Sequence, residues 1–162
     1  MTRLILIQEP QSGLRARFEL LDSAAPQSAA LLWALAGLNG AHDAIHAMWT
    51  GPEISCPIAV TGVPLPVDLA TLPAENATSF PAAGDLVLVP LPAGRWKGTG
   101  VADMVDLGFF YDGGGRLLMP MGWIAGNVCA RVVLEDMVGL QAACRRIRSR
   151  GACQISLSCC TP

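Results

Sequence analysis

Hydrophobic and polar residues alternate near the N-terminus of the chain. In LRARFELL, residues 14–21, apolar residues fall on every second position from Leu14, with Arg or Glu between them. That is the pattern of a strand with one face in water. RLILIQ, residues 3–8, has the composition of another strand, and the EPQSG that joins the two contains the Pro and Gly of a turn. We therefore expect a β-hairpin at the start of the chain.

Two segments have the period of a helix instead. QSAALLWALAG, residues 27–37, follows Asp22, Ser23 and Pro26, which suit a helix start, and it carries an apolar stripe. EDMVGLQAACRRIRSRG, residues 135–151, begins with two acids and ends with arginines before a glycine. Both of its ends complement the helix dipole. We interpret the arginines as a solvated helix end, with an anion-binding site as the alternative.

The remaining predicted elements are short strands separated by Pro and Gly. They are DAIHAMWT (43–50), EISCPIAV (53–60), DLVLVPL (85–91), ADMVDLGFFYD (102–112), RLLMP (116–120), NVCARVV (127–133) and CQISLS (153–158). Many short strands with only two distant helices argue against a doubly wound parallel sheet. We predict a mainly β fold, a closed barrel of about eight mostly antiparallel strands covered by two α-helices. No repeat or linker interrupts the chain, so we expect a single domain over residues 1–162.

Composition and charge limit the partners of the protein. Apolar residues make up 52% of the 162 residues and charged residues 15%, whereas about 25% charged residues is usual. A surface poor in charge favours a homo-oligomer, because exposed apolar patches usually mark contacts. The net charge of −2 without a basic face argues against nucleic acid. No apolar run has the length of a membrane span, and the short apolar N-terminus is not a signal sequence, so we expect a cytoplasmic protein.

The six cysteines show neither C-x-x-C spacing nor a zinc-ligand pattern with histidine. In a reducing compartment we expect them to be free and mostly to act as small core residues. Adjacent cysteines bridge only with a strained peptide, so Cys159 and Cys160 are expected to be two free thiols. We expect no bound metal and no cofactor.

His46 and Glu75 are the candidate catalytic residues. The ordinary pKa of histidine is about 6.5, so His46 can exchange protons at neutral pH. Alternation along the predicted strand over residues 43–50 and the residue before it places His46 on one face with His42 and Thr50. A core histidine bonded to the backbone is the alternative, and a metal held by the two histidines lacks an evident third ligand. Glu75 becomes a base if it is partly buried, unless it belongs to a loop that caps itself.

Six further residues are candidates for ligand binding, because they stand at turns or at strand ends. Trp49 offers a flat wall to a planar ligand, unless it serves only packing. For Asp85, ordinary Gly-Asp turn chemistry is the favoured interpretation. We expect the set to gather with His46 and Glu75 at the mouth of the barrel. Its members are Trp49, Thr50, Asn76, Asp85, Tyr111 and Asn127.

Three motifs together resemble one known family. They are H-A-x-W-[ST]-G, E-N-x-T-x-x-P-x-x-G-D and G-N-x-x-A-R-[IV], matched here at residues 46–51, 75–85 and 126–132. In their order and spacing the chain resembles the bacterial DUF3830 family, of the cyclophilin-like superfamily. The resemblance implies a cyclophilin-like β-barrel and implies no reaction. The F-H-x-V-I-x-x-F-M segment of peptidyl-prolyl isomerases is absent, which argues against that activity.

These features predict a small-molecule metabolic enzyme with a polar site at the barrel mouth. The chain has no motif for a metal, a cofactor or a serine or cysteine nucleophile. The expected reaction is therefore hydrolysis of an amide or cyclic amide, or isomerisation by proton transfer, and the asparagine amides favour hydrolysis. A non-catalytic protein that binds a small molecule or another subunit is the alternative.

Overall fold

A computed structural model gives the fold, and it describes residues 2–95 and 102–160. The helices are α1 (Pro26–Gly37) and α2 (Met137–Arg150), and a short 3-10 turn, η1 (Leu134–Asp136), precedes α2. The strands are β1 (Leu4–Glu9), β2 (Leu14–Leu20), β3 (Ala41–His46), β4 (Glu53–Ala59), β5 (Ala77–Thr78), β6 (Asp85–Leu91), β7 (Met104–Phe110), β8 (Leu118–Met119), β9 (Gly122–Trp123), β10 (Gly126–Val132) and β11 (Cys153–Cys160).

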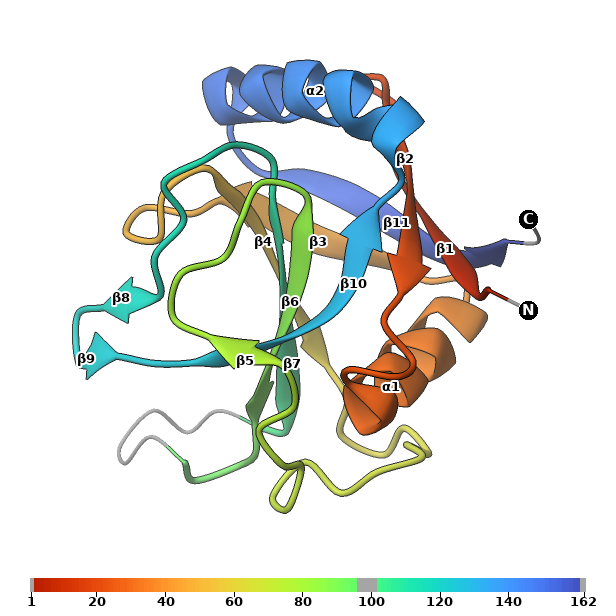
Figure 1. The fold of residues 1–162 in the computed structure, drawn as a ribbon, viewed down its shortest axis with the longest axis vertical. Helices are drawn as coiled ribbons and strands as arrows, with labels where there is room; N and C mark the ends of the chain where they lie inside the picture. The colour runs from red at the N-terminus through yellow and green to blue at the C-terminus, as the bar shows by residue number, and fades with distance from the viewer. Residues whose placement is uncertain (1, 96–101, 161–162) are drawn as a thin grey trace.

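Strand pairing closes the sheet into a barrel. Within the described residues, eight strands follow one another in the order β2-β1-β11-β3-β4-β7-β6-β10, and β10 pairs back onto β2. Neighbours in this ring are antiparallel. The short β5 pairs with Gly126 and Asn127 at the start of β10, on the edge that pairs with β2 further along, and β8 and β9 form a separate hairpin. Figure 1 shows the barrel with α2 and α1 over different parts of it. The predicted closed antiparallel barrel with two helices is confirmed.

Most predicted elements appear with small shifts in their ends. The alternation in LRARFELL becomes β2, in which every second residue is buried. The predicted strand over residues 43–50 is wrong in its second half, because β3 ends at His46. The chain then turns, with Gly51 at a φ of 95° and the Ala47 amide donating to the Glu53 carbonyl. Thr50 therefore does not share a strand face with His46.

Side chains fill the interior of the barrel. Phe18 of β2 and Phe109 of β7 meet edge to face with ring centroids 6.2 Å apart, and both are fully buried. Aliphatic residues such as Ile5, Ile54 and Leu107 complete this core from other strands. The helices contribute buried residues to the same cluster. The interior is thus a packed core, as small barrels often have.

A second apolar cluster lies outside the barrel wall. Val87 of β6, Phe110 of β7 and Val128 of β10 are buried there against Leu117, which belongs to the segment leading into β8. Ile124, after β9, packs against the same cluster. The outer faces of β6, β7 and β10 are therefore covered by the chain between β7 and β10. This cover makes a concave surface where an ordinary barrel would face water.

The cysteines are free, as predicted. Cys56, Cys129 and Cys144 are buried, and Cys153, Cys159 and Cys160 are partly buried. Burial raises the pKa of the Cys56 thiol to about 12. No helix in the described residues has both the length and the apolar character that a membrane span requires. Nor do those residues hold a group of three His, Cys, Asp or Glu side chains arranged to ligate a metal.

The packed interior predicts a large effect for Phe18→Ala. This change empties volume beside Phe109, so the free energy of unfolding should fall by about 3–5 kcal/mol in urea unfolding. Leu134→Ala is the matched control, because the Leu134 side chain is 84% exposed and its loss should change stability by less than about 0.5 kcal/mol. Similar small losses in both variants would contradict a tightly packed barrel interior.

Candidate functional site

A pocket of about 180 Å³ lies on the outer wall of the barrel. Its floor is built from outward-facing residues of β4, β7 and β6, which are neighbours in the sheet. Across these strands Ser55 lies opposite Gly108, and Gly108 lies opposite Val87. One step along, Asp106 lies opposite Val89. The pocket therefore presents two polar strands, β4 and β7, beside an apolar one.

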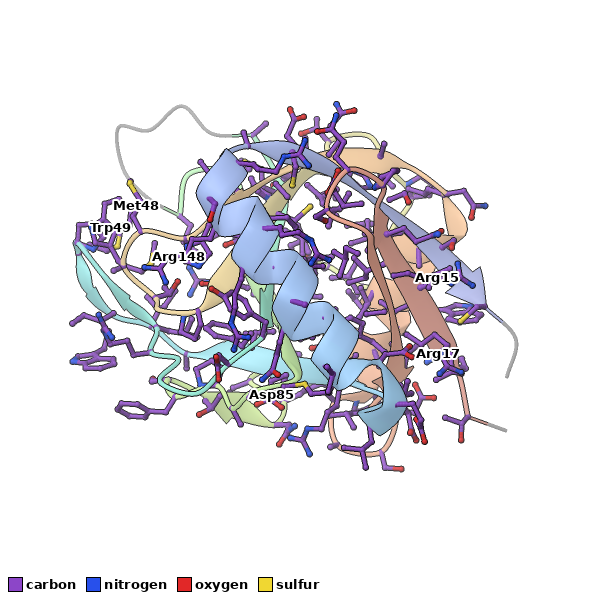
Figure 2. All side chains as sticks on the ribbon, turned by 90° about the horizontal axis from the view of Figure 1, so that it is seen from above. Arg15, Arg17, Met48, Trp49, Asp85 and Arg148 are labelled. Atoms are coloured by element: carbon purple, nitrogen blue, oxygen red, sulfur yellow. The ribbon has the colours of Figure 1, made fainter. Side chains whose placement is uncertain are left out.

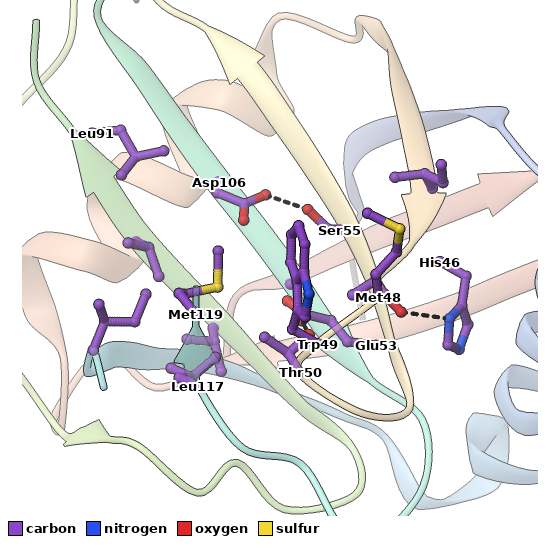
Figure 3. Close-up of a pocket in the computed structure, with 16 residues that line it drawn as sticks. His46, Met48, Trp49, Thr50, Glu53, Ser55, Leu91, Asp106, Leu117 and Met119 are labelled. Atoms are coloured by element: carbon purple, nitrogen blue, oxygen red, sulfur yellow. Dashed lines mark hydrogen bonds between the residues drawn. The ribbon is translucent and has the colours of Figure 1, made fainter. Parts of the chain in front are cut away.

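Two loops form the walls of this outer-wall pocket. The turn between β3 and β4 supplies Met48 and Trp49, and the segment around β8 and β9 supplies Leu117 and Met119 (Figure 3). The turn is held to the loop after β7, since the Arg116 amide donates to the Thr50 carbonyl over 3.0 Å. Both walls are mainly apolar, so a ligand in the pocket would lose most of its contact with water.

The carboxyl of Glu53 lies in this pocket with little exposure to water. The residue is 4% exposed, and its Oε2 accepts a hydrogen bond from the Thr50 hydroxyl. No described residue donates to Oε1. A Cβ on Gly108 would lie only 1.8 Å from that oxygen, so the glycine makes the space that the carboxyl occupies. Burial raises the pKa of Glu53 to about 7, although the bond from Thr50 lowers it and the charge of Asp106 adds a further rise.

Asp106 is the second acid in the pocket. Its Oδ1 accepts a hydrogen bond of 2.9 Å from the Ser55 hydroxyl, as Figure 3 shows. Burial raises the pKa of Asp106, and the hydrogen bonds from Ser55 and from the Cys56 backbone oppose this only in part. The pocket thus holds two carboxyls that retain protons more readily than exposed carboxyls do.

The other buried or paired acids have partners that stabilise their charge. Glu9 accepts hydrogen bonds from the backbone amides of Gln11 and Ser12. Asp85 pairs with Arg131, and Asp136 pairs with an arginine of β2. By contrast, no arginine or lysine of the described chain lines the outer-wall pocket. An unpaired buried acid destabilises a fold, so its presence in a pocket marks a candidate functional group.

His46 stands at the edge of the pocket and bonds away from the two acids. Its Nδ1 lies 2.9 Å from the Ala47 carbonyl and its Nε2 lies 2.9 Å from the Tyr111 hydroxyl. A carbonyl only accepts, so in the neutral ring Nδ1 carries the proton and Nε2 accepts from Tyr111. Burial lowers the pKa of His46, and the charge of Arg148 lowers it further, while the bond to Ala47 opposes the change. These contacts favour a neutral histidine that fixes Tyr111.

Comparison with known proteins places the chain in a family. The family model described as protein of unknown function, DUF3830, matches residues 7–159. The chain belongs to the DUF3830 family. None of the curated proteins compared with it matches significantly.

Among solved structures, the DUF3830 chain is similar to McbB, determined in complex with tryptophan, with 19% identity and a TM-score of 0.64. The match covers 95% of this chain and 44% of McbB, so the chain spans less than half the length of that protein. A cyclophilin-type peptidyl-prolyl cis-trans isomerase of Cryptosporidium parvum has 12% identity and a TM-score of 0.48, over 100% of this chain and 99% of that one. The Mimivirus cyclophilin has 14% identity and a TM-score of 0.48, and the match covers 98% of this chain and 87% of that one.

The DUF3830 structure brings four of the predicted site residues together. His46, Trp49 and Thr50 line the outer-wall pocket. Tyr111 is the hydrogen-bond partner of His46 and lines the neighbouring cavity behind residues 46–48. This group gathers on the outer wall of the barrel and not around an interior cavity.

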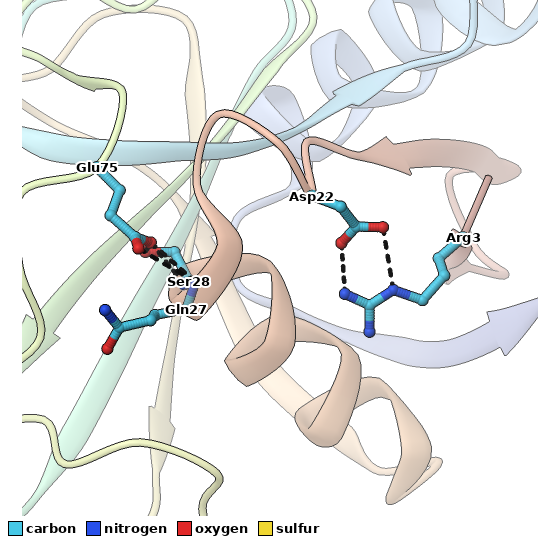
Figure 4. Close-up of polar contacts among 5 residues, drawn as sticks. All are labelled: Arg3, Asp22, Gln27, Ser28 and Glu75. Carbon is cyan, nitrogen blue, oxygen red and sulfur yellow. Dashed lines mark hydrogen bonds and ion pairs between the residues drawn. The ribbon is translucent and has the colours of Figure 1, made fainter. Parts of the chain in front are cut away.

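Glu75 takes part in a different arrangement. Its carboxylate accepts hydrogen bonds from the Gln27 and Ser28 amides and from the Ser28 hydroxyl, at the start of α1 (Figure 4). The helix has no side-chain cap of its own at Ala25, so Glu75 supplies one from a distant loop. It lines neither of the cavities that His46 lines. The structure therefore does not bring the two predicted catalytic residues together.

The two asparagines and Asp85 also bond within the protein. Asn127 accepts from the Glu75 amide and donates to the Ser28 hydroxyl and the Pro73 carbonyl, although it also lines a separate surface pocket. Asn76 has a φ of 47° and donates to the Val128 carbonyl. Asp85 accepts from the Ala82 amide and pairs with Arg131. The side-chain amides of Asn76 and Asn127, on which the prediction of amide hydrolysis rested, are thus engaged in holding the loop before β5.

Sequence reasoning missed Glu53 and Asp106. Each is an acid inside an otherwise apolar strand segment, EISCPIAV or DLGFF, and that was the available signal. Strand alternation puts them on the face opposite to Ile54 and Leu107, which point into the core. An outward acid normally meets water. Only the cover supplied by the segment before β10 turns this face into a pocket.

The raised pKa of Glu53 predicts a specific pH dependence of stability. The folded protein keeps a proton, up to a pKa of about 7, that the unfolded chain releases near the ordinary value of 4.5. Stability from this group is therefore complete below pH 4.5 and is lost as the pH rises through 7, by about 3 kcal/mol. Glu53→Gln should remove that loss, so urea unfolding should show the variant gaining on the wild type between pH 4 and pH 8.

Glu9→Gln is the contrasting control for this measurement. Hydrogen bonds from Ser12 and Gln11 outweigh burial and lower the pKa of Glu9, so its stabilising effect is present at high pH and lost on acidification. This variant should lose stability relative to the wild type at pH 8 and less so at low pH. The same pH trend in both variants would contradict the burial of Glu53 as its cause.

The position of Glu53 also depends on Gly108. Gly108→Ala should push the carboxyl out of its place, because the new Cβ would overlap Oε1. We expect the pKa of Glu53, measured by carbon NMR of the carboxyl, to move toward the ordinary value of a glutamate as water reaches it. Gly139→Ala on α2, where a Cβ meets nothing within 4 Å, should leave this pKa unchanged. An unaltered pKa in Gly108→Ala would contradict the described packing.

Proposed function

We propose that the protein is a small-molecule enzyme in which Glu53 transfers protons on a substrate held in the outer-wall pocket. The observation that supports this most directly is a carboxyl in an apolar pocket without a cation, with its pKa raised to about 7. A group with that pKa is partly ionised and partly protonated at neutral pH, so it can take up a proton and give it back. Paired structural acids do not have this property.

Isomerisation by proton transfer fits the pocket better than hydrolysis. The ionised Glu53 would remove a proton from a carbon next to a substrate carbonyl and, as the acid, return it to a neighbouring position. Asp106, whose pKa burial also raises, would in its protonated form donate a hydrogen bond to the carbonyl oxygen, where negative charge develops. The C–H bond that breaks is replaced by one that forms elsewhere, so no second substrate is needed.

The apolar walls favour a compact substrate with a flat or apolar body. Trp49 is 48% exposed at the edge of the pocket, where its ring offers a face to a planar group. Leu117 and Met119 close the opposite side. Such walls exclude water, which strengthens the electrostatic effect of the acids on the substrate.

Hydrogen–deuterium exchange tests the proposal before the natural substrate is known. Compact apolar carbonyl compounds are incubated with the enzyme in D2O, and deuterium uptake at carbon is followed by NMR. We expect Glu53→Gln to slow the exchange by at least about 100-fold. The rate for the wild type should rise with pH through about 7, because the ionised form of Glu53 is the base.

Glu75→Gln is the matched control, since it removes an equivalent charge outside the pocket. It should retain the exchange rate and lose only stability at α1, by about 1 kcal/mol. Equal exchange by the wild type and Glu53→Gln would remove Glu53 from the mechanism. Compounds that raise the melting temperature but never exchange would favour a binding protein without catalysis.

A further inference from the structure

A second, larger cavity of about 490 Å³ adjoins the outer-wall pocket. The two share His46, Ala47 and Met48, so only this segment separates them. The second cavity lies between the turn after β3, the loop after β7 and the last turns of α2. Its polar lining includes Arg116, Arg145 and Arg148, and we name it the arginine cavity.

Two of these three arginines have no ion-pair partner among the described residues. Arg145 binds Asp112 over 2.8 Å, whereas Arg116 and Arg148 form no ion pair. Most other arginines are engaged. Arg3, Arg17 and Arg131 each form an ion pair with an aspartate. Arg146 donates to the Ser12 carbonyl, and Arg150 donates to the Gln11 carbonyl. Two guanidinium groups without an acid partner, those of Arg116 and Arg148, thus line the same cavity, whereas Arg15 is exposed on β2 outside it.

The remaining groups in the arginine cavity do not cancel this charge. His46 is neutral in the arrangement described above, with both ring nitrogens bonded. Asp112 is the one acid that lines the cavity within the described chain, and Arg145 already pairs with it. Burial raises the pKa of Tyr111, so its hydroxyl stays neutral, although the charge of Arg148 opposes this rise. The cavity therefore keeps a net positive charge.

We propose that the arginine cavity binds the carboxylate of the same substrate whose apolar body occupies the outer-wall pocket. This inference rests on the proposed function. A guanidinium group binds a carboxylate through two parallel hydrogen bonds, so an arginine without an acid partner is well suited to a carboxylate ligand. The substrate class is then a compact carboxylic acid with a flat or apolar body that also carries the carbon at which Glu53 exchanges a proton.

The boundary between the two cavities allows one ligand to reach both. Met48 is 78% exposed at this boundary, so a ligand can pass over it without displacing a buried side chain. Figure 2 shows Arg148 on the side of the molecule that carries Met48 and Trp49, while Arg15 and Arg17 lie on the opposite side. The arginines of α2, interpreted from the sequence as a solvated helix end, thus include one placed for ligand binding.

Calorimetric titration with phenylacetate and its neutral analogue phenylacetamide tests the inference on the whole protein. Wild type should bind the carboxylate at least about tenfold more tightly than the amide, as expected for charge-assisted hydrogen bonds. Arg148→Gln should remove this preference without weakening the amide, and Arg148→Lys should restore part of it. Arg15→Gln is the matched control, because it removes an exposed arginine outside the cavity and should leave the preference intact.

Equal affinity for the two probes, or binding of neither, would overturn the inference. An equal loss of the carboxylate preference in Arg15→Gln and Arg148→Gln would also overturn it, because the effect would then be one of overall charge.

The exchange assay distinguishes failure of this inference from failure of the proposed function. If Glu53-dependent exchange persists without an anion preference, only the arginine cavity is rejected. If phenylacetate binds through Arg148 but Glu53 has no role in exchange, the proton-transfer mechanism is rejected and the anion site stands.

Discussion

Closure of the barrel between β2 and β10 is the constraint from which the rest of the structure follows. Residues Leu20 to Phe18 pair with Ala130 to Val132, and this joins the two ends of the ring. Closure turns one face of every strand inward, where Phe18 and Phe109 fill the available volume. A barrel of about this strand number holds either side chains or one small ligand. Side chains occupy it here, and the pocket that holds Glu53 and Asp106 lies outside this interior, on the outer wall.

The outer wall carries a pocket because part of this wall is apolar and is covered by another segment of the chain. Val87 and Phe110 face outward and are nonetheless buried, since Leu117 and the chain that follows it lie over them. This cover leaves a gap above β4 and β7, and Glu53 lies in that gap. A carboxyl placed there loses hydration without gaining a cation, so it destabilises the fold above neutral pH. Such local instability is common where a group serves a function.

The fold could be predicted further than the site, for reasons that individual residues make clear. Alternation in residues 14–20 shows which face of the strand is buried. A closed barrel could be predicted because the chain has enough strands of this kind to complete a ring. The H-A-x-W-T-G motif covers the turn that forms one wall of the pocket. Glu53 stands two residues beyond it, but its burial depends on a covering segment far along the chain. Glu75 also stands in a conspicuous motif, but its carboxylate accepts hydrogen bonds from backbone amides of α1, and no local sequence pattern reveals that partner.

His46 links the two cavities without needing to act as a base. Its Nδ1 is committed to the Ala47 carbonyl, and its Nε2 accepts from Tyr111. A proton added to Nε2 would require the Tyr111 hydroxyl hydrogen to turn away from the ring. The added positive charge would also be repelled by the charge of Arg148. The neutral ring therefore holds residues 46–48, which form the wall common to the carboxyls on one side and the arginines on the other. On this interpretation the histidine is a positioning residue, and proton transfer is left to the carboxyl that is buried without a cation.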